Sequence, residues 1–311
     1  MTGARRATGR RVMRALFRLV SLTALAPSLL LSGCFIFFTT RKLPVPVAPA
    51  VVQTVTPDQL VARLNGRWTA FDTMTAKVEM LSSVLETKQG VAKDYTRVGG
   101  QIVIRKPNEL RVLGRAPVVG IELFDMASNG KNFTFYIPAK NIAYKGPARL
   151  NKISANELEN LRPEFFLDSL VVHGLDPDEF YSVTSDSETM EDTSKKHLHF
   201  VPEYILSITR HIAGSHRDKP VRVITFHRED LLPYEQDLYD DEGNLATHVT
   251  YQDYKDFGSG LYPSTITIKL PLEDKQIVML VEKESESVPT PLPADEFELT
   301  VPAGVTITNL D

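Results

Sequence analysis

A change of hydrophobic period limits what this 311-residue chain can fold into. Leu60, Leu64, Trp68 and Phe71 recur at the spacing of one helix face, whereas from about Thr75 onward apolar and polar residues alternate. A period of two is the pattern of a strand that buries one face. Because this pattern continues through most of the chain, the sequence predicts a mainly β α+β protein built on a long antiparallel sheet.

The expected strands form two groups, separated by a helical stretch. The first group comprises residues 75–85, 99–106, 109–113, 120–127, 131–137 and 141–144, and the second comprises 196–201, 204–210, 222–227, 234–239, 245–251, 262–270 and 276–281. The pairs Pro107-Asn108 and Asn129-Gly130 predict tight turns, and residues 241–244 predict a hairpin turn. A twisted sheet of ten or more strands normally curls, so we expect a curved sheet.

Helices are expected before the sheet and midway along it. Thr56, Pro57 and Asp58 combine an N-cap, a proline at the first helical position and an acid in the first turn, so a helix begins there. Helical spacing returns over residues 154–171, where a capping box and then Pro163 predict two short helices.

The first 33 residues have the organisation of a secretory signal peptide. Six arginines precede an apolar run from Leu19 to Leu31, which is too short and interrupted for a spanning helix of roughly 20 apolar residues. Residues 31–34, Leu-Ser-Gly-Cys, resemble a bacterial lipobox. The resemblance implies lipid attachment on the Cys34 sulfur, cleavage before Cys34 and acylation of the freed amine. The alternative is an inert, buried cysteine.

Charge limits the partners of the remaining chain. Removing the six arginines of residues 1–33 from the 35 basic residues leaves 29 against 39 acidic ones, a net charge of −10. Such a domain is a poor nucleic-acid binder, so membrane attachment is expected through acylated Cys34, with two or three acyl chains. The single cysteine excludes an intramolecular disulfide. Residues 34–55, rich in Pro and Val, predict a semi-rigid tether, and residues 56–311 predict a single domain.

Three short segments carry a resemblance to a known family. They are residues 100–111, with a basic-Pro turn and a following Arg; 128–138, with an Asn-Gly turn before an aromatic strand; and 297–305, with a closing strand and a Pro turn. With the order of elements, they resemble the LolA/LolB-like lipoprotein carriers of the bacterial periplasm and outer membrane. The resemblance implies an incomplete β-barrel that wraps a lid formed by the N-terminal helix and two short helices, and an apolar space that binds acyl chains.

The same resemblance implies candidate site residues. The apolar ligand cavity would be lined by Trp68, Phe71, Ile102, Ile104, Phe133, Phe135, Phe165 and Phe166. The alternative is that these side chains form a dry core. In the family's outer-membrane receptor, one loop carries an exposed apolar residue after a proline, and Val118 and Val119 occupy that place here. Valine is smaller than the leucine expected there, and the alternative is a buried hairpin end.

Motifs for catalysis or metal binding are weak or absent in the sequence. His197 and His199 would share one strand face, but no third ligand accompanies them in a recognisable motif. The acidic residues between Asp237 and Glu242 fit a solvated turn better than a calcium loop. No nucleophile elbow, zinc-protease motif or phosphate-binding glycine loop occurs. We therefore expect no enzyme, no cofactor and no metal.

These features predict a monomeric lipoprotein on the periplasmic face of the outer membrane, because Phe35 is not the Asp that resembles an inner-membrane retention signal in enteric bacteria. Expected partners are acyl chains of lipoproteins or lipids, and a periplasmic carrier protein. The predicted function is reversible binding during transfer or insertion of a lipoprotein or another amphiphile. The alternatives are a protein-binding or sensory module of the same fold, and a structural envelope protein whose cavity is filled by side chains.

Overall fold

The computed structural model describes residues 51–86, 91–94, 97–149, 163–191, 198–258, 260–283, 292–293 and 295–310. The chain divides into two compact units, residues 1–45 and 46–311, and all described residues belong to the second. Within these ranges, no helix combines the length and the hydropathy needed to cross a membrane. Cys34, the short helix expected to begin at Ser154, and His197 lie outside the described residues.

Helix α2 (Pro57–Thr69) begins where the sequence predicts. The Thr56 hydroxyl oxygen accepts a hydrogen bond from the Gln59 N–H at 3.3 Å, and the Gln59 side-chain oxygen accepts one from the Thr56 N–H at 2.9 Å. This capping box satisfies two N–H groups that the helix itself leaves unpaired. The apolar stripe follows on the inside, where Leu60 and Leu64 are fully buried.

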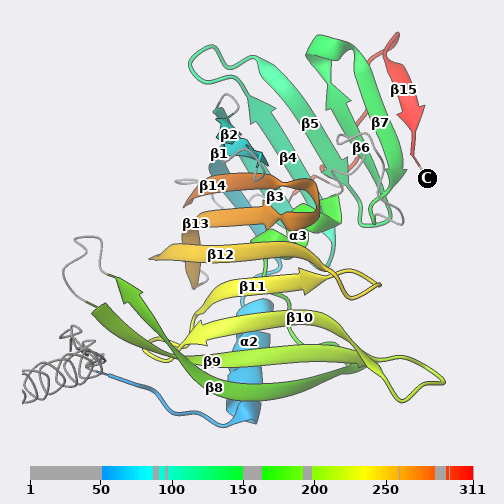
Figure 1. Ribbon diagram of the computed structural model, residues 1–311. Helices are drawn as coiled ribbons and strands as arrows, with labels where there is room; N and C mark the ends of the chain where they lie inside the picture. Colours follow the sequence, from blue (N-terminus) through cyan, green and yellow to red (C-terminus); the bar gives the residue numbers. More distant parts are fainter. Residues whose placement is uncertain are drawn as a thin grey trace, which may run out of the picture. The chain divides into compact units, whose positions relative to one another are not determined.

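In the described part of the chain, the strands form one sheet of 15 strands that curves without closing into a barrel (Figure 1). Its order is β15-β7-β6-β5-β4-β3-β1-β14-β13-β12-β11-β10-β9-β8, with β2 paired to β1 beside this path. The strands are β1 (Thr73–Glu86), β2 (Val91–Asp94), β3 (Val98–Arg105), β4 (Glu109–Arg115), β5 (Glu122–Ser128), β6 (Asn132–Ile137), β7 (Ile142–Pro147), β8 (Glu179–Glu191), β9 (Leu198–His211), β10 (Asp218–His227), β11 (Pro233–Tyr239), β12 (Leu245–Asp256), β13 (Leu261–Leu270), β14 (Lys275–Lys283) and β15 (Thr306–Asn309). Short 3₁₀ turns η1 (Pro138–Lys140) and η3 (Pro271–Glu273) join neighbouring strands. The predicted mainly β fold with an incomplete barrel is confirmed.

The two strands expected on either side of Pro202 are one continuous strand, β9. In the strand ladders, residues 198–202 pair only with β8, and pairing with β10 starts at Glu203, opposite His227. Just past the end of β10, the Arg228 N–H donates to the Pro202 carbonyl at 2.9 Å. Proline lacks an N–H group, so a strand tolerates it where one edge is free. Pro202 therefore does not interrupt the strand, contrary to the expectation.

The C-terminal edge also differs from the expectation. Residues 298–305 have turn and irregular structure, and the closing strand is β15, which follows them. It runs parallel to β7, with Thr306 opposite Ile142 and Asn309 opposite Lys145. A parallel neighbour requires a long connection, and residues 148–305 separate β7 from β15 in the chain. The purely antiparallel sheet that the sequence predicted is therefore wrong at this edge.

Both described helices lie on the same face of the sheet, behind the strands in Figure 1, and we call this the inner face. The strand register places Ile224, Gln236, Val249 and Ile268 side by side across β10 to β13, so they share that face. One core cluster packs α2 against β9 and β10. A larger cluster packs helix α3 (Pro163–Leu170) against strands of the other half of the sheet.

Alanine at Gly100 is expected to destabilise the domain. A Cβ atom there would lie 1.9 Å from the carbonyl oxygen of Leu113 on the paired strand β4, so the two backbones would have to separate. We expect Gly100→Ala to lower the free energy of unfolding by about 1–3 kcal/mol, measured by urea denaturation. Gly99→Ala is the matched control, because a Cβ at Gly99 meets nothing within 4 Å. Equal losses in both variants would contradict the prediction.

Candidate functional site

A pocket of about 1010 Å³, which we call the main pocket, opens beside α2. Its wall is built by the C-terminal half of α2, residues 170–172 at the end of α3, the loop 230–233 between β10 and β11, and the facing ends of β12 and β13. Residues of β1 and β3 and of the segment 292–296 complete it. Ligand pockets in proteins usually measure about 300–1,000 Å³, so this volume is large enough for a lipid chain.

The wall of the main pocket combines apolar and polar residues. Its aromatic members are Phe71, Tyr251, Tyr254, Phe257 and Tyr262, and its aliphatic members are Ala70, Met74, Val103, Leu170, Val171, Val172, Leu231, Leu232, Pro233, Leu261, Pro263, Leu292 and Pro293. Thr73, Thr75 and Gln101 add polar groups from β1 and β3. Moving one methylene group from water into such surroundings is worth about 0.8 kcal/mol. The pocket therefore suits a ligand with an extended hydrocarbon part.

A backbone irregularity at Asp253 brings two tyrosines of β12 into this wall. Residues three apart on a regular strand point to opposite faces, which would separate Tyr251 from Tyr254. Asp253 has a φ of +55°, its carbonyl oxygen accepts a hydrogen bond from the Ser264 hydroxyl at 2.7 Å, and its carboxylate accepts one from the Thr265 hydroxyl at 3.0 Å. These bonds hold the irregular conformation that places both rings in the pocket.

Two of the three pocket tyrosines are hydrogen-bonded to the backbone. Tyr254 donates to the carbonyl of Pro233, and Tyr262 donates to the carbonyl of Leu170 at 2.8 Å. The Tyr251 side chain is buried, with 2% of the residue exposed, and its hydroxyl has no hydrogen-bond partner among the described residues. Burial raises the pKa of all three phenols, so each stays protonated at neutral pH.

The rim of the main pocket is polar. Arg63 and Arg67 lie one turn apart on α2, and the half-buried Arg67 donates from Nη2 to the Leu261 carbonyl at 3.0 Å. Asp230 and Glu296 also line the pocket. Apolar walls with a charged rim are the arrangement expected for a ligand that has one end in water and the other inside the protein.

The residues predicted to line a ligand cavity do not all lie in the main pocket. Phe71 lies in the wall of the main pocket. Five others are core residues with at most 8% exposure, namely Ile102, Ile104, Phe133, Phe135 and Phe166. Trp68 packs on the same core and stacks on His173 with ring centres 4.3 Å apart, and the side chain of Phe165 lies outside the described residues. Because α3 packs directly on the strands that carry these core residues, the main pocket lies beside α3 and not beneath it.

One of these core residues also borders a second, smaller hollow. Phe133 lines a pocket of about 480 Å³ between β6, β7 and the C-terminal segment.

Sequence reasoning missed most of the main pocket. The expected strand 245–251 ends before Tyr254, and the left-handed conformation of Asp253 leaves no pattern that the sequence shows. Arg63 and Arg67 had a detectable signal, since they lie four residues apart beside the apolar stripe of a helix.

The loop between β4 and β5 is fully accessible. Val118 exposes 105% of the reference accessible surface of a valine, and Val119 and Ile121 expose 65% and 64% of their reference surfaces. The Ala116 N–H donates to the Ile121 carbonyl at 2.7 Å, and the Gly120 N–H donates to the Ala116 carbonyl at 3.0 Å, which closes the loop. The alternative of a buried hairpin end is thus excluded, and three apolar side chains stand in solvent.

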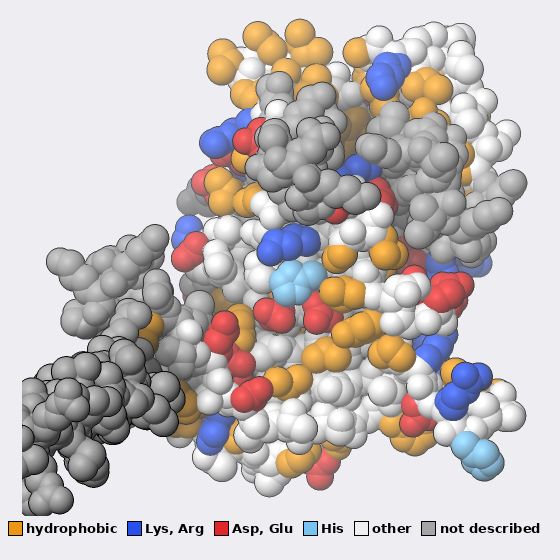
Figure 2. Space-filling view, viewed as in Figure 1, with side chains coloured by type: hydrophobic (Ala, Val, Ile, Leu, Met, Phe, Trp, Pro, Cys, Tyr) orange, Lys and Arg blue, Asp and Glu red, His pale blue; other side chains and the backbone are white. Residues whose placement is uncertain are grey.

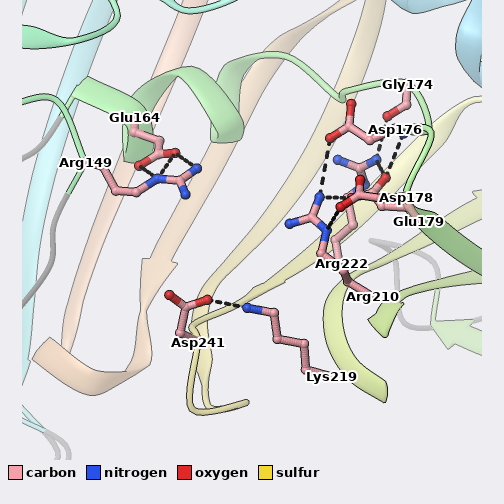
Figure 3. A network of polar contacts seen from close by, with 10 residues as sticks. All are labelled: Arg149, Glu164, Gly174, Asp176, Asp178, Glu179, Arg210, Lys219, Arg222 and Asp241. Atoms are coloured by element: carbon pink, nitrogen blue, oxygen red, sulfur yellow. Dashed lines mark hydrogen bonds and ion pairs between the residues drawn. The ribbon is translucent and has the colours of Figure 1, made fainter. Parts of the chain in front are cut away.

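A network of ion pairs fixes the segment that follows α3 (Figure 3). Arg222 of β10 donates to the Glu179 carboxylate at 2.8 Å and to the Gly174 carbonyl at 2.5 Å, and Arg210 lies 3.5 Å from the same carboxylate. The Arg222 and Glu179 side chains are 8% and 1% exposed. Burial lowers the pKa of Arg222, and the charge of Glu179 opposes this shift. Because residues 170–172 line the main pocket, the network supports one of its walls.

One group of side chains on the outer face has the composition of a metal site. Potential ligand atoms of Glu235, Asp237 and His248 lie within 4.8 Å of one another. His248 Nδ1 is 2.7 Å from a carboxylate oxygen of Asp237, a bond that raises the pKa of His248, and Lys269 is paired opposite His248 on β13. Acidic, basic and histidine side chains gather in the middle of this face in Figure 2. A cross-strand row of alternating charge accounts for these contacts.

Comparison with known proteins gives structural relatives only. No family model and no curated protein matches the chain. It is similar to a LolA superfamily protein from Nitrosomonas europaea, with 12% identity over 78% of this chain and 98% of that one and a TM-score of 0.46. A DUF1329 family protein from Desulfovibrio piger is 14% identical over 77% and 95%, with a TM-score of 0.47. An outer membrane lipoprotein-sorting protein domain from Vibrio parahaemolyticus is 12% identical over 78% and 94%, with a TM-score of 0.46.

Proposed function

We propose that this chain is an envelope lipoprotein whose main pocket binds acyl chains of a lipoprotein or of another amphiphile. The observation that carries the proposal is the combination of a volume of about 1010 Å³, an aromatic and aliphatic wall, and a charged rim. Burying ten methylene groups would contribute roughly 8 kcal/mol, from which the cost of association is subtracted. Binding of this kind is noncovalent and reversible, as a carrier or acceptor requires.

The anchor proposed at Cys34 would keep the pocket at a membrane. One acyl chain binds a bilayer only marginally, so stable attachment needs the two or three chains that the lipobox resemblance implies. The residue after the cysteine, Phe35, supports the outer membrane as the location. Separation of inner and outer membranes on a density gradient tests this location, and recovery with the inner membrane would contradict it.

The volume of the main pocket favours the carrier over the structural alternative. A purely structural lipoprotein of this fold would fill the space beside its helices with side chains, as the core beneath α3 does. A protein-binding module remains the competing proposal, and pull-down with the acylated protein separates the two, because a carrier captures diverse lipoproteins and a sensor captures one partner.

Ligand uptake tests the proposed function. The chain from residue 34, carrying Cys34→Ser so that no acyl group can be attached to it, is purified without detergent and examined by native mass spectrometry. We expect a copurified lipid, or one-to-one uptake of an added fluorescent fatty acid. A protein that contains no lipid and takes up none would overturn the proposal.

The exposed β4–β5 loop is expected to contact a membrane surface during transfer. Each valine that leaves water contributes about 1.5–3 kcal/mol, so Val118→Asp combined with Val119→Asp should weaken vesicle binding of the Cys34→Ser chain at least tenfold in a flotation assay. Leu272→Asp is the control, because Leu272 is 52% exposed and lies in η3, away from this loop in the sequence. Equal binding by the loop variant and the control would show that the loop does not touch lipid.

A further inference from the structure

One histidine and two carboxylates meet on the outer face of the sheet. Gln236 and Val249 face inward, so the residues that alternate with them on β11 and β12 point to the opposite side. Glu235 and Asp237 lie two residues apart on β11, and His248 of β12 is paired with Asp237. One ligand atom of each of the three lies within 4.8 Å of the other two. The strand register therefore brings three potential metal ligands to one place.

Glu235 is the member of this group that the fold does not use. Asp237 and His248 form a pair, with 2.7 Å between a carboxylate oxygen and Nδ1. Glu235 is half-buried, and no described residue makes a hydrogen bond or an ion pair with its carboxylate. Burial raises the pKa of Glu235, and the charges of Asp237 and Glu188 add to the shift. A row of alternating charge explains the Asp237–His248 pair, but it places no cation in contact with Glu235.

The charge and the chemistry of this group favour a divalent transition metal. The ionisable groups that act on Glu235 are His248, Asp237, Glu188 and Lys269. With a neutral histidine, three carboxylates and one ammonium leave a net charge of −2, which a divalent cation offsets. Ca²⁺ and Mg²⁺ prefer oxygen ligands alone, whereas Zn²⁺ binds both imidazole nitrogen and carboxylate oxygen.

We propose that Glu235, Asp237 and His248 bind one divalent transition-metal ion, with Zn²⁺ as the ion that fits these ligands. The ion contacts His248 Nδ1 and one oxygen of each carboxylate, and a fourth position stays open to water or to an outside ligand. Nδ1 gives up the proton that it shares with Asp237. A neutral ring moves this proton to Nε2, and a charged ring releases it to water.

The site is independent of the proposed acyl binding, because it lies on the face of the sheet opposite α2 and α3. The sequence carries no motif for it. Asp237 and His248 are eleven residues apart, and only the pairing of β11 with β12 brings them together.

Titration with zinc chloride, followed by isothermal titration calorimetry, tests the proposal. The chain from residue 34 with Cys34→Ser, made without a histidine tag, also lacks the only thiol, which would itself bind Zn²⁺. We expect one bound ion per chain. Glu235→Gln should weaken Zn²⁺ binding about tenfold or more, since even the loss of a group behind a metal ligand costs that much. The Tm of metal-free Glu235→Gln should not fall, because the carboxylate has no partner to lose.

Two further variants separate this site from other histidines and from folding defects. His211 and Asp218 form a similar pair, with 2.9 Å between Nδ1 and a carboxylate oxygen, and no third ligand joins them in the described chain. His211→Ala should therefore keep the Zn²⁺ affinity that His248→Ala loses. Lys269→Met should raise this affinity severalfold, because the ammonium acts on both Glu235 and His248 and repels a cation. A gain in affinity cannot result from unfolding.

Four results would overturn the inference. An unchanged affinity in Glu235→Gln, or several bound ions that His248→Ala leaves in place, would show an adventitious ion only. A lower Tm of metal-free Glu235→Gln would show that the carboxylate serves the fold. If the parent chain binds no Zn²⁺, the site does not exist, and this outcome leaves acyl binding untouched, because fatty-acid uptake is measured without added metal.

Discussion

Replacing Arg222 with methionine is expected to lower the free energy of unfolding by about 3 kcal/mol, the lower end of the range for breaking a buried ion pair. The substitution leaves the Glu179 carboxylate, 1% exposed, without its main partner, and it removes the donor to the Gly174 carbonyl. Arg210 at 3.5 Å and the Asp176 N–H at 2.9 Å remain beside Glu179, which is why the upper end of the range is not expected.

Urea denaturation monitored by circular dichroism measures this loss of stability. Two further variants test its cause. Lys219→Met breaks the pair with Asp241, whose side chain is 85% exposed, and should cost at most about 1 kcal/mol. Arg222→Met combined with Glu179→Met removes both buried charges and should recover much of the loss, because a well-packed apolar pair can replace a buried ion pair. A single Arg222→Met variant no less stable than Lys219→Met would contradict the assignment of the network as a support of the pocket wall.

Local signals in the sequence predicted the elements of this fold well. The start of α2 follows from Thr56 and Pro57, since the cap is formed by residues within one turn. The hairpin turn at residues 241–244 follows likewise, because Gly243 adopts a φ of +85° that favours glycine and its N–H bonds the Asp240 carbonyl at 3.1 Å. In each case the residues that decide the conformation are neighbours in the chain.

Features that depend on distant contacts escaped prediction. Pro202 is tolerated because β10 does not extend along that part of β9, and β15 pairs with β7 only after a crossover. The resemblance implies a cavity lined by residues that include Ile102 and Ile104, but α3 packs on these side chains and fills that space. The packing of α3 determines which of these apolar side chains are buried against other side chains and which line a pocket.

Blocking the main pocket from α2 is the prediction with the largest expected effect on ligand binding. Gly66 lies in the interior of α2, lines the pocket, and has nothing within 4 Å of the position of a Cβ atom. Gly66→Trp therefore adds a large ring at the rim without a backbone clash. If the ring excludes three methylene groups of the ligand, about 2.4 kcal/mol of binding is lost, roughly fiftyfold in affinity for the fluorescent fatty acid.

Gly66→Ala is the matched control, because it makes the same change at the backbone with little change in pocket volume. Alanine in a helix interior is more favourable than glycine by about 1 kcal/mol, so this variant should unfold at higher urea concentration and bind the fatty acid as the wild type does. If Gly66→Trp binds the ligand weakly but is as stable as the wild type, the loss of affinity results from the blocked pocket and not from unfolding. Wild-type affinity in Gly66→Trp would instead place acyl binding elsewhere on the domain, because Gly66 is one of the residues that line the main pocket.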